Sequence, residues 1–116
     1  MFKSEHFDLA LIDELRELME GDFDTLLSTF ISDSENKLSA IANAVSADNA
    51  DDLKRTAHSL KGSSSNLGAV HLSELCFELE KMGRDNCLDL ASQKLEDLRT
   101  SLSDATNYYQ SLLGSR

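Results

Sequence analysis

The sequence of 116 residues contains no proline and no tryptophan. Average usage would give roughly six prolines in a chain of this length. β-Branched residues are also scarce, since valine and isoleucine together occur five times against 20 leucines. Proline breaks helices and β-branched residues favour strands, so this composition argues against a β-sandwich or an α/β enzyme. We expect an all-α fold in a single domain spanning residues 1–116.

Basic residues and long apolar runs are few as well. The chain has 11 lysine and arginine residues against 21 aspartate and glutamate residues, a net charge of −10. A duplex-binding domain normally needs a basic face, so we expect no nucleic-acid partner. The longest apolar run is the Leu-Ala-Leu-Ile of residues 9–12, far short of the roughly 18 residues of a membrane span. With no signal-peptide pattern at the N-terminus, the sequence predicts a soluble cytoplasmic protein without a membrane partner.

The possible metal ligands and disulfides are too few to define a site. Two cysteines, Cys76 and Cys87, cannot form the disulfide framework of a small secreted protein, so we expect two reduced thiols. The Glu-x-x-His pattern of di-iron bundles does not occur. His71 and Glu74 alone make too thin a ligand set. We therefore expect no metal site.

Apolar residues recur at helical spacing along the chain. The pattern predicts a short N-terminal helix over about 8–20 and four longer helices over about 23–46, 50–67, 70–83 and 88–113. Because the breaks between the helices are short, sequential helices should run antiparallel. The predicted architecture is an antiparallel up-down four-helix bundle with an additional short N-terminal helix.

Capping residues mark several of the helix ends. Asp8 and Asn49 stand where side chains are expected to cap helix N-termini. Gly21, Gly68 and Gly83 stand where three of the helices are expected to end.

The predicted third helix carries a histidine, a lysine and a glycine in its interior. At about 100° per residue, its core direction is marked by Leu53, Ala57, Leu60, Ser64 and Leu67. On the same wheel His58 points about 140° away from the core, Lys61 about 80° and Gly62 about 180°. His58 is therefore predicted to face solvent, bordered by a cation and a glycine.

The residues around His58 suit phosphoryl transfer. A glycine inside a helix costs about 1 kcal/mol relative to alanine, and Gly62 at i+4 leaves a gap beside the imidazole. Lys61 at i+3 can bring an ammonium to an anion held on the ring. An exposed imidazole is partly uncharged at neutral pH and can act as a nucleophile. A nucleophile, an open approach and a nearby cation together favour phosphoryl transfer.

The alternative interpretation of His58 is an ordinary solvated surface residue, which is the usual role of a lone exposed histidine. The neighbouring charges argue against it. Lys54, Arg55 and Lys61 are three of only 11 cations and flank this one histidine. A basic cluster of this kind suits an anionic ligand or an acidic partner surface.

Two segments resemble a known family. Ala57-His58-Ser59-Leu60-Lys61-Gly62, followed by Asn66-Leu67-Gly68-Ala69, resembles the signature of histidine-containing phosphotransfer (HPt) domains. The resemblance extends over almost the whole chain, through Phe30, Leu53, Arg55, Leu72, Leu75, Leu79 and Glu80. It implies a four-helix bundle with an exposed histidine on the second bundle helix, in agreement with the helical wheel.

The resemblance also implies a function, that of a phosphohistidine carrier in a bacterial multistep phosphorelay. His58 would be the phosphoacceptor, Lys61 would lie beside the phosphoryl group, and Gly62 would keep the approach open. HPt domains do not bind ATP and have no autokinase activity. They take the phosphoryl group from a receiver-domain aspartate and pass it to another, and the receiver supplies the Mg²⁺. The implied partners are receiver domains of a hybrid sensor histidine kinase and of a response regulator, and the implied state is a monomer with no cofactor of its own.

Other residues are weaker candidates for the site. Glu78 and Glu80 are expected to lie near the level of His58, where one carboxylate could bind the non-reacting ring nitrogen or Lys61. Solvated surface is the default interpretation of both. Candidate docking residues for a receiver are Lys54, Arg55, Ser65, Leu11 and Leu15, and core capping is an equal alternative for the two leucines.

Two other functions are weighed against the carrier. One is a helical adaptor or inhibitor that docks a receiver or a histidine kinase without phosphotransfer, which the intact set of His58, Lys61 and Gly62 argues against. The other is a small metal or cofactor bundle, which the missing ligand pairs argue against. Because the chain begins at methionine and holds little beyond the domain, we expect a free-standing HPt protein.

Overall fold

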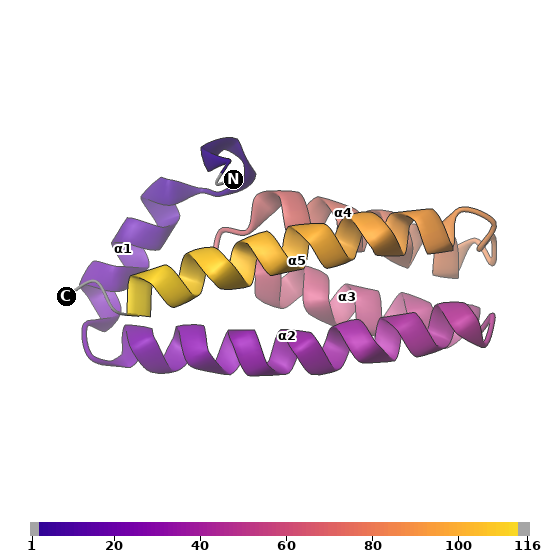
Figure 1. The fold of residues 1–116 in the computed structure, drawn as a ribbon, viewed down its shortest axis with the longest axis horizontal. Helices are drawn as coiled ribbons and strands as arrows, with labels where there is room; N and C mark the ends of the chain where they lie inside the picture. Colours follow the sequence, from indigo (N-terminus) through magenta and orange to yellow (C-terminus); the bar gives the residue numbers. More distant parts are fainter. Residues whose placement is uncertain (1–2, 114–116) are drawn as a thin grey trace.

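The computed structural model describes residues 3–113, and all regular elements within that range are helices. A short 3₁₀ turn, η1 (Ser4–His6), precedes the helices α1 (Leu9–Met19), α2 (Asp22–Ser46), α3 (Ala50–Asn66), α4 (Val70–Arg84) and α5 (Ala91–Leu113). Each of the long helices α3, α4 and α5 runs antiparallel to the long helix before it in the chain, and α1 lies across one end of the bundle (Figure 1). The predicted bundle with a short N-terminal helix is confirmed.

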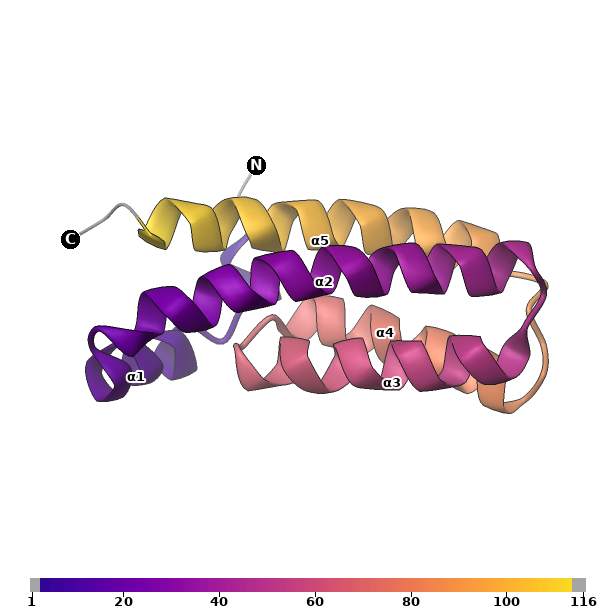
Figure 2. The ribbon, with the colours of Figure 1, turned by 90° about the horizontal axis from the view of Figure 1, so that it is seen from below.

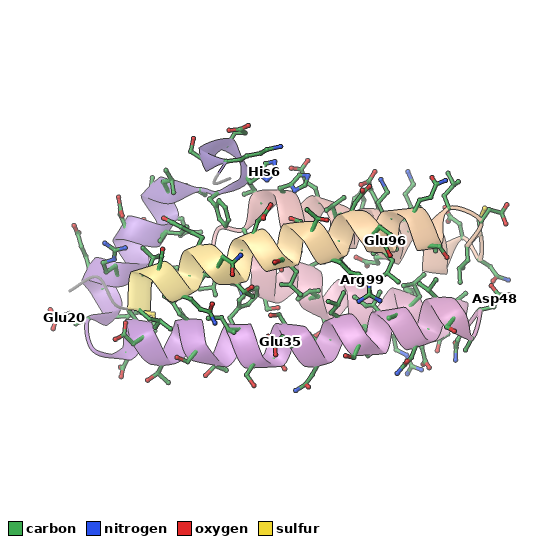
Figure 3. The ribbon with its side chains drawn as sticks, in the orientation of Figure 1. His6, Glu20, Glu35, Asp48, Glu96 and Arg99 are labelled. Carbon is green, nitrogen blue, oxygen red and sulfur yellow. The ribbon has the colours of Figure 1, made fainter. Side chains whose placement is uncertain are left out.

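The bundle has two layers. In a view turned by 90° from that of Figure 1, α2 and α5 form one layer and α3 and α4 form the other (Figure 2). Each long helix packs against two others, and the contact between α3 and α4 is the most extensive. Glu35 of α2 and Glu96 of α5 are exposed on the outer layer opposite α3 and α4 (Figure 3). The two faces of the molecule are therefore distinct, and the α3–α4 face carries His58.

One apolar stripe from each helix forms the core. On α3 the buried residues are Leu53, Ala57, Leu60 and Ser64, as the helical wheel predicts. The remaining face of α3 is left to solvent, which is what exposes His58. Among residues 3–113, no helix has both the length and the apolar content that a membrane crossing needs.

The predicted caps are present at three helix ends. The Asp8 carboxylate accepts a hydrogen bond from the Leu11 N–H at 3.1 Å at the start of α1. Asn49 caps α3 by accepting from the Asp52 N–H at 3.1 Å. Gly68 follows α3 with a φ of +77°, a conformation that favours glycine.

Three of the predicted helix ends are wrong. The left-handed residue after α1 is Glu20, with a φ of 43°, whereas Gly21 has a right-handed helical backbone and is the N-cap residue of α2. The fourth helix does not end at Gly83 but continues through it to Arg84. The last helix begins at Ala91 instead of about residue 88. At Gly21 and Gly83 the glycine therefore does not mark the end of a helix.

The segment before α1 is fastened to the start of α4. The imidazole rings of His6 and His71 stack with centroids 3.8 Å apart and planes 13° from parallel. His71 Nδ1 lies 3.0 Å from the hydroxyl of buried Ser101 on α5. The Asp8 N–H donates to the Gly68 carbonyl at 2.8 Å. These contacts tie η1 and α1 to the end of the bundle at which α3 and α4 are joined.

Mild acid is expected to weaken this attachment. Burial lowers the pKa of His71 below its ordinary value of 6.5, and His6 and Lys3 lower it further, against the opposing carboxylates of Glu74 and Asp97. A histidine whose pKa is lower in the folded state binds fewer protons there than in the unfolded state. Its contribution is therefore present above about pH 6.5 and is lost as the pH falls through the folded-state pKa.

The measurement is thermal unfolding at about pH 7.5 and about pH 5.5, followed by circular dichroism. The His71→Gln variant should show a smaller loss of Tm between the two pH values than the wild type. An equal loss in both proteins would mean that other groups dominate the acid response.

Candidate functional site

His58 stands on the exposed face of α3, opposite Glu80 of α4. Its side chain is 67% exposed, and its Nδ1 lies 2.9 Å from Glu80 Oε2. The two residues are brought together by the antiparallel packing of α3 and α4, whose backbones meet closely at Gly83. The imidazole is therefore held at one nitrogen while the rest of the ring faces solvent.

The Glu80 carboxylate is ionised at neutral pH. Burial raises its pKa, but the hydrogen bonds and charges of Lys61 and His58 outweigh this effect and leave the pKa below its ordinary value of 4.5. An ionised carboxylate only accepts hydrogen bonds, so the His58 Nδ1 must carry the hydrogen and donate it. In the neutral imidazole the lone pair is then on Nε2. Glu80 selects the ring tautomer whose nucleophilic nitrogen is Nε2.

Lys61 shares the same carboxylate. Its Nζ lies 2.7 Å from Glu80 Oε1, and its side chain is 28% exposed. One carboxylate thus binds the imidazole through one oxygen and the ammonium through the other. The ammonium and the imidazole are therefore held on the two oxygens of a single carboxylate.

Gly62 leaves open space beside the histidine. A Cβ built on Gly62 would have no atom within 4 Å outside its own helix, and the residue is exposed. The glycine is therefore not required by packing. This agrees with the sequence-based reason for it, an unobstructed approach to the ring from solvent.

Comparison with known proteins assigns the family. The Hpt domain model matches residues 25–108. The crystal structure of histidine-containing phosphotransfer protein B from Pseudomonas aeruginosa PAO1 is similar over 96% of this chain and 96% of its own length, with 35% sequence identity and a TM-score of 0.93. The chain belongs to the Hpt domain family. It is accordingly a phosphohistidine carrier in phosphorelay signalling, and receiver domains are its class of partner.

A second solved structure shows how widely the Hpt fold is kept. A rice protein described as a histidine-containing phosphotransfer protein has 24% sequence identity and a TM-score of 0.83, covering 93% of this chain and 79% of its own. At that identity the likeness concerns the fold alone. Among curated proteins, none matches this chain.

The basic cluster of this Hpt chain is more neutral than the sequence suggested. Lys54 Nζ lies 3.7 Å from the Asp51 carboxylate, and Arg55 contacts Asp51 at 2.8 Å and Asp52 at 3.3 Å. Lys61 is paired with Glu80 as described above. All three cations of the predicted basic cluster are therefore paired, because α3 carries acidic residues one turn before Lys54 and Arg55, and Lys61 meets Glu80. The pairs of Lys54 and Arg55 are exposed, so each contributes little to stability.

The predicted docking residues lie on two sides of the Hpt site. Ser65 is exposed on α3. Leu15 lines an apolar groove of about 310 Å³ between α1, α2 and the end of α3. Other residues of this groove are Met19, Leu26, Phe30, Ser63 and Asn66. Leu11 is half-buried and is not part of the groove.

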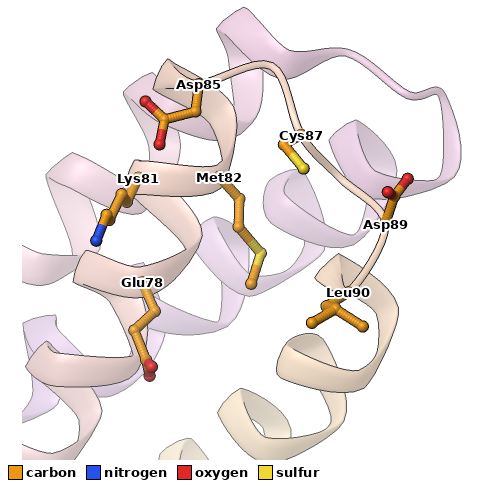
Figure 4. Close-up of a pocket in the computed structure, with 7 residues that line it drawn as sticks. All are labelled: Glu78, Lys81, Met82, Asp85, Cys87, Asp89 and Leu90. Carbon is orange, nitrogen blue, oxygen red and sulfur yellow. The ribbon is translucent and has the colours of Figure 1, made fainter.

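Glu78 and Glu80 have different environments although they are two residues apart. Glu78 Oε2 lies 3.4 Å from Lys94 Nζ of α5, and it lines a cavity of about 550 Å³ near the α4–α5 connection (Figure 4). Its side chain is 50% exposed, as expected for solvated surface. Glu80 is only 14% exposed, so solvated surface is the wrong interpretation of Glu80. The alternative is a contact with the ring nitrogen or with Lys61, and Glu80 makes both contacts.

The remaining reactive side chains do not join the Hpt site. Cys76 is buried, and burial raises the pKa of its thiol to about 12. Cys87 is exposed on the α4–α5 connection. Within residues 3–113, no group of three or more histidine, cysteine, aspartate or glutamate side chains is arranged to hold a metal ion.

Proposed function

We propose that His58 is the phosphoacceptor of this Hpt protein, through Nε2. The observation that carries the proposal is the shared Glu80 carboxylate, which binds Nδ1 of His58 and the ammonium of Lys61 at the same time. It leaves Nε2 as the free nucleophilic nitrogen of an exposed ring.

The proposed reaction is an in-line displacement at phosphorus. The Nε2 lone pair attacks the phosphoryl group of a receiver aspartyl phosphate, a P–N bond forms, and the P–O bond to the aspartate breaks. The aspartate leaves as a carboxylate with the electron pair of that bond. The imidazole keeps its Nδ1 hydrogen and becomes cationic, and the Glu80 carboxylate offsets that charge at 2.9 Å. The reverse steps deliver the phosphoryl group to a second aspartate.

Lys61 and Gly62 act on the phosphoryl group from two sides. The Lys61 ammonium offsets negative charge on the phosphoryl oxygens as they approach the ring, which is the main catalytic device available in phosphoryl transfer. Gly62 has no side chain beside the ring, so a receiver domain can bring its aspartate close to Nε2. This chain supplies neither ATP binding nor autokinase activity, and the receiver supplies the Mg²⁺.

Receiver docking is proposed to use the groove between α1, α2 and α3. Leu15, Phe30 and Asn66 belong to its lining, and apolar surface at its centre with polar residues at its rim is typical of a protein interface. Lys54, Arg55 and Ser65 extend the surface along α3 toward acidic residues of the partner. We further propose a cytoplasmic monomer that meets its receivers one at a time.

The direct test is phosphotransfer from a panel of phosphorylated receiver domains. The protein should acquire a label that is labile in acid and stable in base, as expected of a phosphoramidate bond to histidine, and ¹⁵N NMR should place it on Nε2. Receivers that bind the protein without labelling it would instead support the adaptor function.

Gly62→Gln is expected to slow transfer from a receiver by at least about tenfold, because displacement of a reacting group by about 1 Å can cost about 100-fold. The variant should be no less stable than the wild type, since glutamine is the better helix former and a Cβ at this position meets no atom within 4 Å. Ser92→Gln, at an exposed position of α5, is the matched control. Unchanged transfer in Gly62→Gln would remove the proposed role of the glycine.

A further inference from the structure

Phe77 is an exposed aromatic residue next to the proposed phosphoryl site. Its side chain is 46% exposed, although phenylalanine is among the residues most often buried. The Lys61 Nζ lies 5.3 Å from the centroid of its ring, within the range of a cation–π interaction. The ring thus faces the charged group of a residue of the site while much of its surface remains in water.

Phe77 is one of three α4 residues that contact Lys61. The Ser73 hydroxyl donates a hydrogen bond to the Lys61 carbonyl at 3.4 Å, and Glu80 Oε1 lies 2.7 Å from its Nζ. Residues 73, 77 and 80 are spaced i, i+4 and i+7, so they form one stripe along the helix. This stripe holds the lysine at its backbone and at its ammonium, and Phe77 is its central member.

We propose that Phe77 is a positioning residue whose ring keeps the Lys61 ammonium beside His58. The inference rests on the proposed function of His58. Once phosphoryl oxygens compete with Glu80 for the ammonium, the Glu80 contact alone no longer fixes the flexible lysine side chain. The ring is uncharged and is not displaced by an anion, so it continues to hold the ammonium while the phosphoryl group arrives. A cation that is already in place does not have to be ordered during the reaction.

The test uses phosphoramidate, a small phosphoryl donor that needs no receiver. In this reaction the Nε2–P bond forms, the P–N bond of the N-protonated donor breaks, and ammonia leaves with that electron pair. Phe77→Leu, which keeps an apolar side chain and removes the ring, is expected to slow labelling of His58 by about two- to fivefold, the range for loss of an exposed cation–π contact. Phe77→Tyr should retain the wild-type rate. Leu90→Ala, at an apolar residue with 58% exposure, should also leave the rate unchanged.

A double-mutant cycle separates action through Lys61 from any other effect of Phe77. In the Lys61→Gln background, Phe77→Leu is expected to cause no further loss of rate, because the group that it positions is gone. A second readout is the NMR shift of the Lys61 Hε protons. The aromatic ring should shift them upfield in the wild type and in Phe77→Tyr, and the shift should be absent in Phe77→Leu.

Three outcomes would overturn the proposal. One is an unchanged labelling rate in Phe77→Leu, including the case in which only transfer from a receiver is slowed, since Phe77 would then contact the partner directly. Another is that Phe77→Leu slows labelling of His58 in the Lys61→Gln background by the same factor as in the wild type. The third is the absence of a ring-dependent shift of the Lys61 protons. Failure of the proposed function looks different, because wild-type His58 would then acquire no label from phosphoramidate or from any receiver.

Discussion

Replacement of His58 by glutamine is expected to abolish phosphoryl uptake completely while the protein remains folded. The side chain is 67% exposed, and its contact within the site is the one with Glu80. Glutamine can still donate a hydrogen bond to that carboxylate but has no nucleophilic nitrogen. Exposed polar substitutions of this kind usually change the free energy of unfolding by less than about 0.5 kcal/mol. Labelling by a phosphorylated receiver and thermal unfolding are measured on the same preparation.

The outcome separates His58 from the other described histidines. His6 and His71 stack against each other in the attachment of the N-terminal segment, and neither contacts Glu80. Label that persists in His58→Gln would assign the phosphoryl group to another residue. A loss of several kcal/mol in stability would show that His58 supports the fold, against its exposure.

Gly83→Ala is expected to be among the most destabilising single changes in the protein. A Cβ at this position would lie 2.6 Å from the Ala50 carbonyl oxygen and 2.7 Å from the Lys54 backbone nitrogen. Both atoms belong to the backbone of α3, so the clash can be relieved only by moving one helix away from the other. Overpacking of this kind costs typically about 1–3 kcal/mol and occasionally more. We expect a net loss of at least about 2 kcal/mol even after the gain of about 1 kcal/mol in helix propensity.

Gly62→Ala is the matched control, because Gly62 is also a glycine inside a helix but has nothing within 4 Å of an added Cβ. It should raise stability by up to about 1 kcal/mol. In thermal unfolding the two variants should therefore shift in opposite directions, with Gly83→Ala lower by roughly 8 °C or more. The same direction of change in both would mean that α3 and α4 do not pack as closely as the structure has them. Any Gly83→Ala protein that folds should also transfer more slowly, since the register that sets Glu80 against His58 is disturbed.

Local sequence patterns were sufficient to predict the bundle and the exposure of His58. Both depend on the spacing of apolar residues, and on α3 that spacing puts Leu53, Ala57 and Leu60 in the core. The caps at Asp8 and Asn49 are likewise local, because a side chain bonds a backbone group three residues away.

The features that sequence reasoning left open or missed depend on how two helices are placed against each other. Glu80 reaches His58 across 22 positions of sequence, and no periodicity within α4 distinguishes it from Glu78. Gly83 stands where the sequence predicts a helix end, because a glycine near a predicted terminus usually is one, whereas in the structure it serves the contact with α3. Phe77 gave one usable signal, since it lies off the apolar stripe of α4 that includes Leu75, Cys76 and Leu79. An aromatic residue outside the core stripe of a helix is worth examining for such a contact.

The Glu80–His58 hydrogen bond determines which hydrogen the imidazole keeps during phosphoryl relay. In the proposed transfer the Nδ1 hydrogen stays on the ring, held by a carboxylate whose pKa lies below its ordinary value of 4.5. When the attacking ring is neutral, the phosphoryl group therefore arrives at Nε2 and departs from it without any movement of the Nδ1 hydrogen. Because the carrier is regenerated in each cycle, it leaves the equilibrium between the two receiver aspartates unchanged. Which way the phosphoryl group flows would be decided by the relative stability of the two aspartyl phosphates, with this protein as the carrier between them.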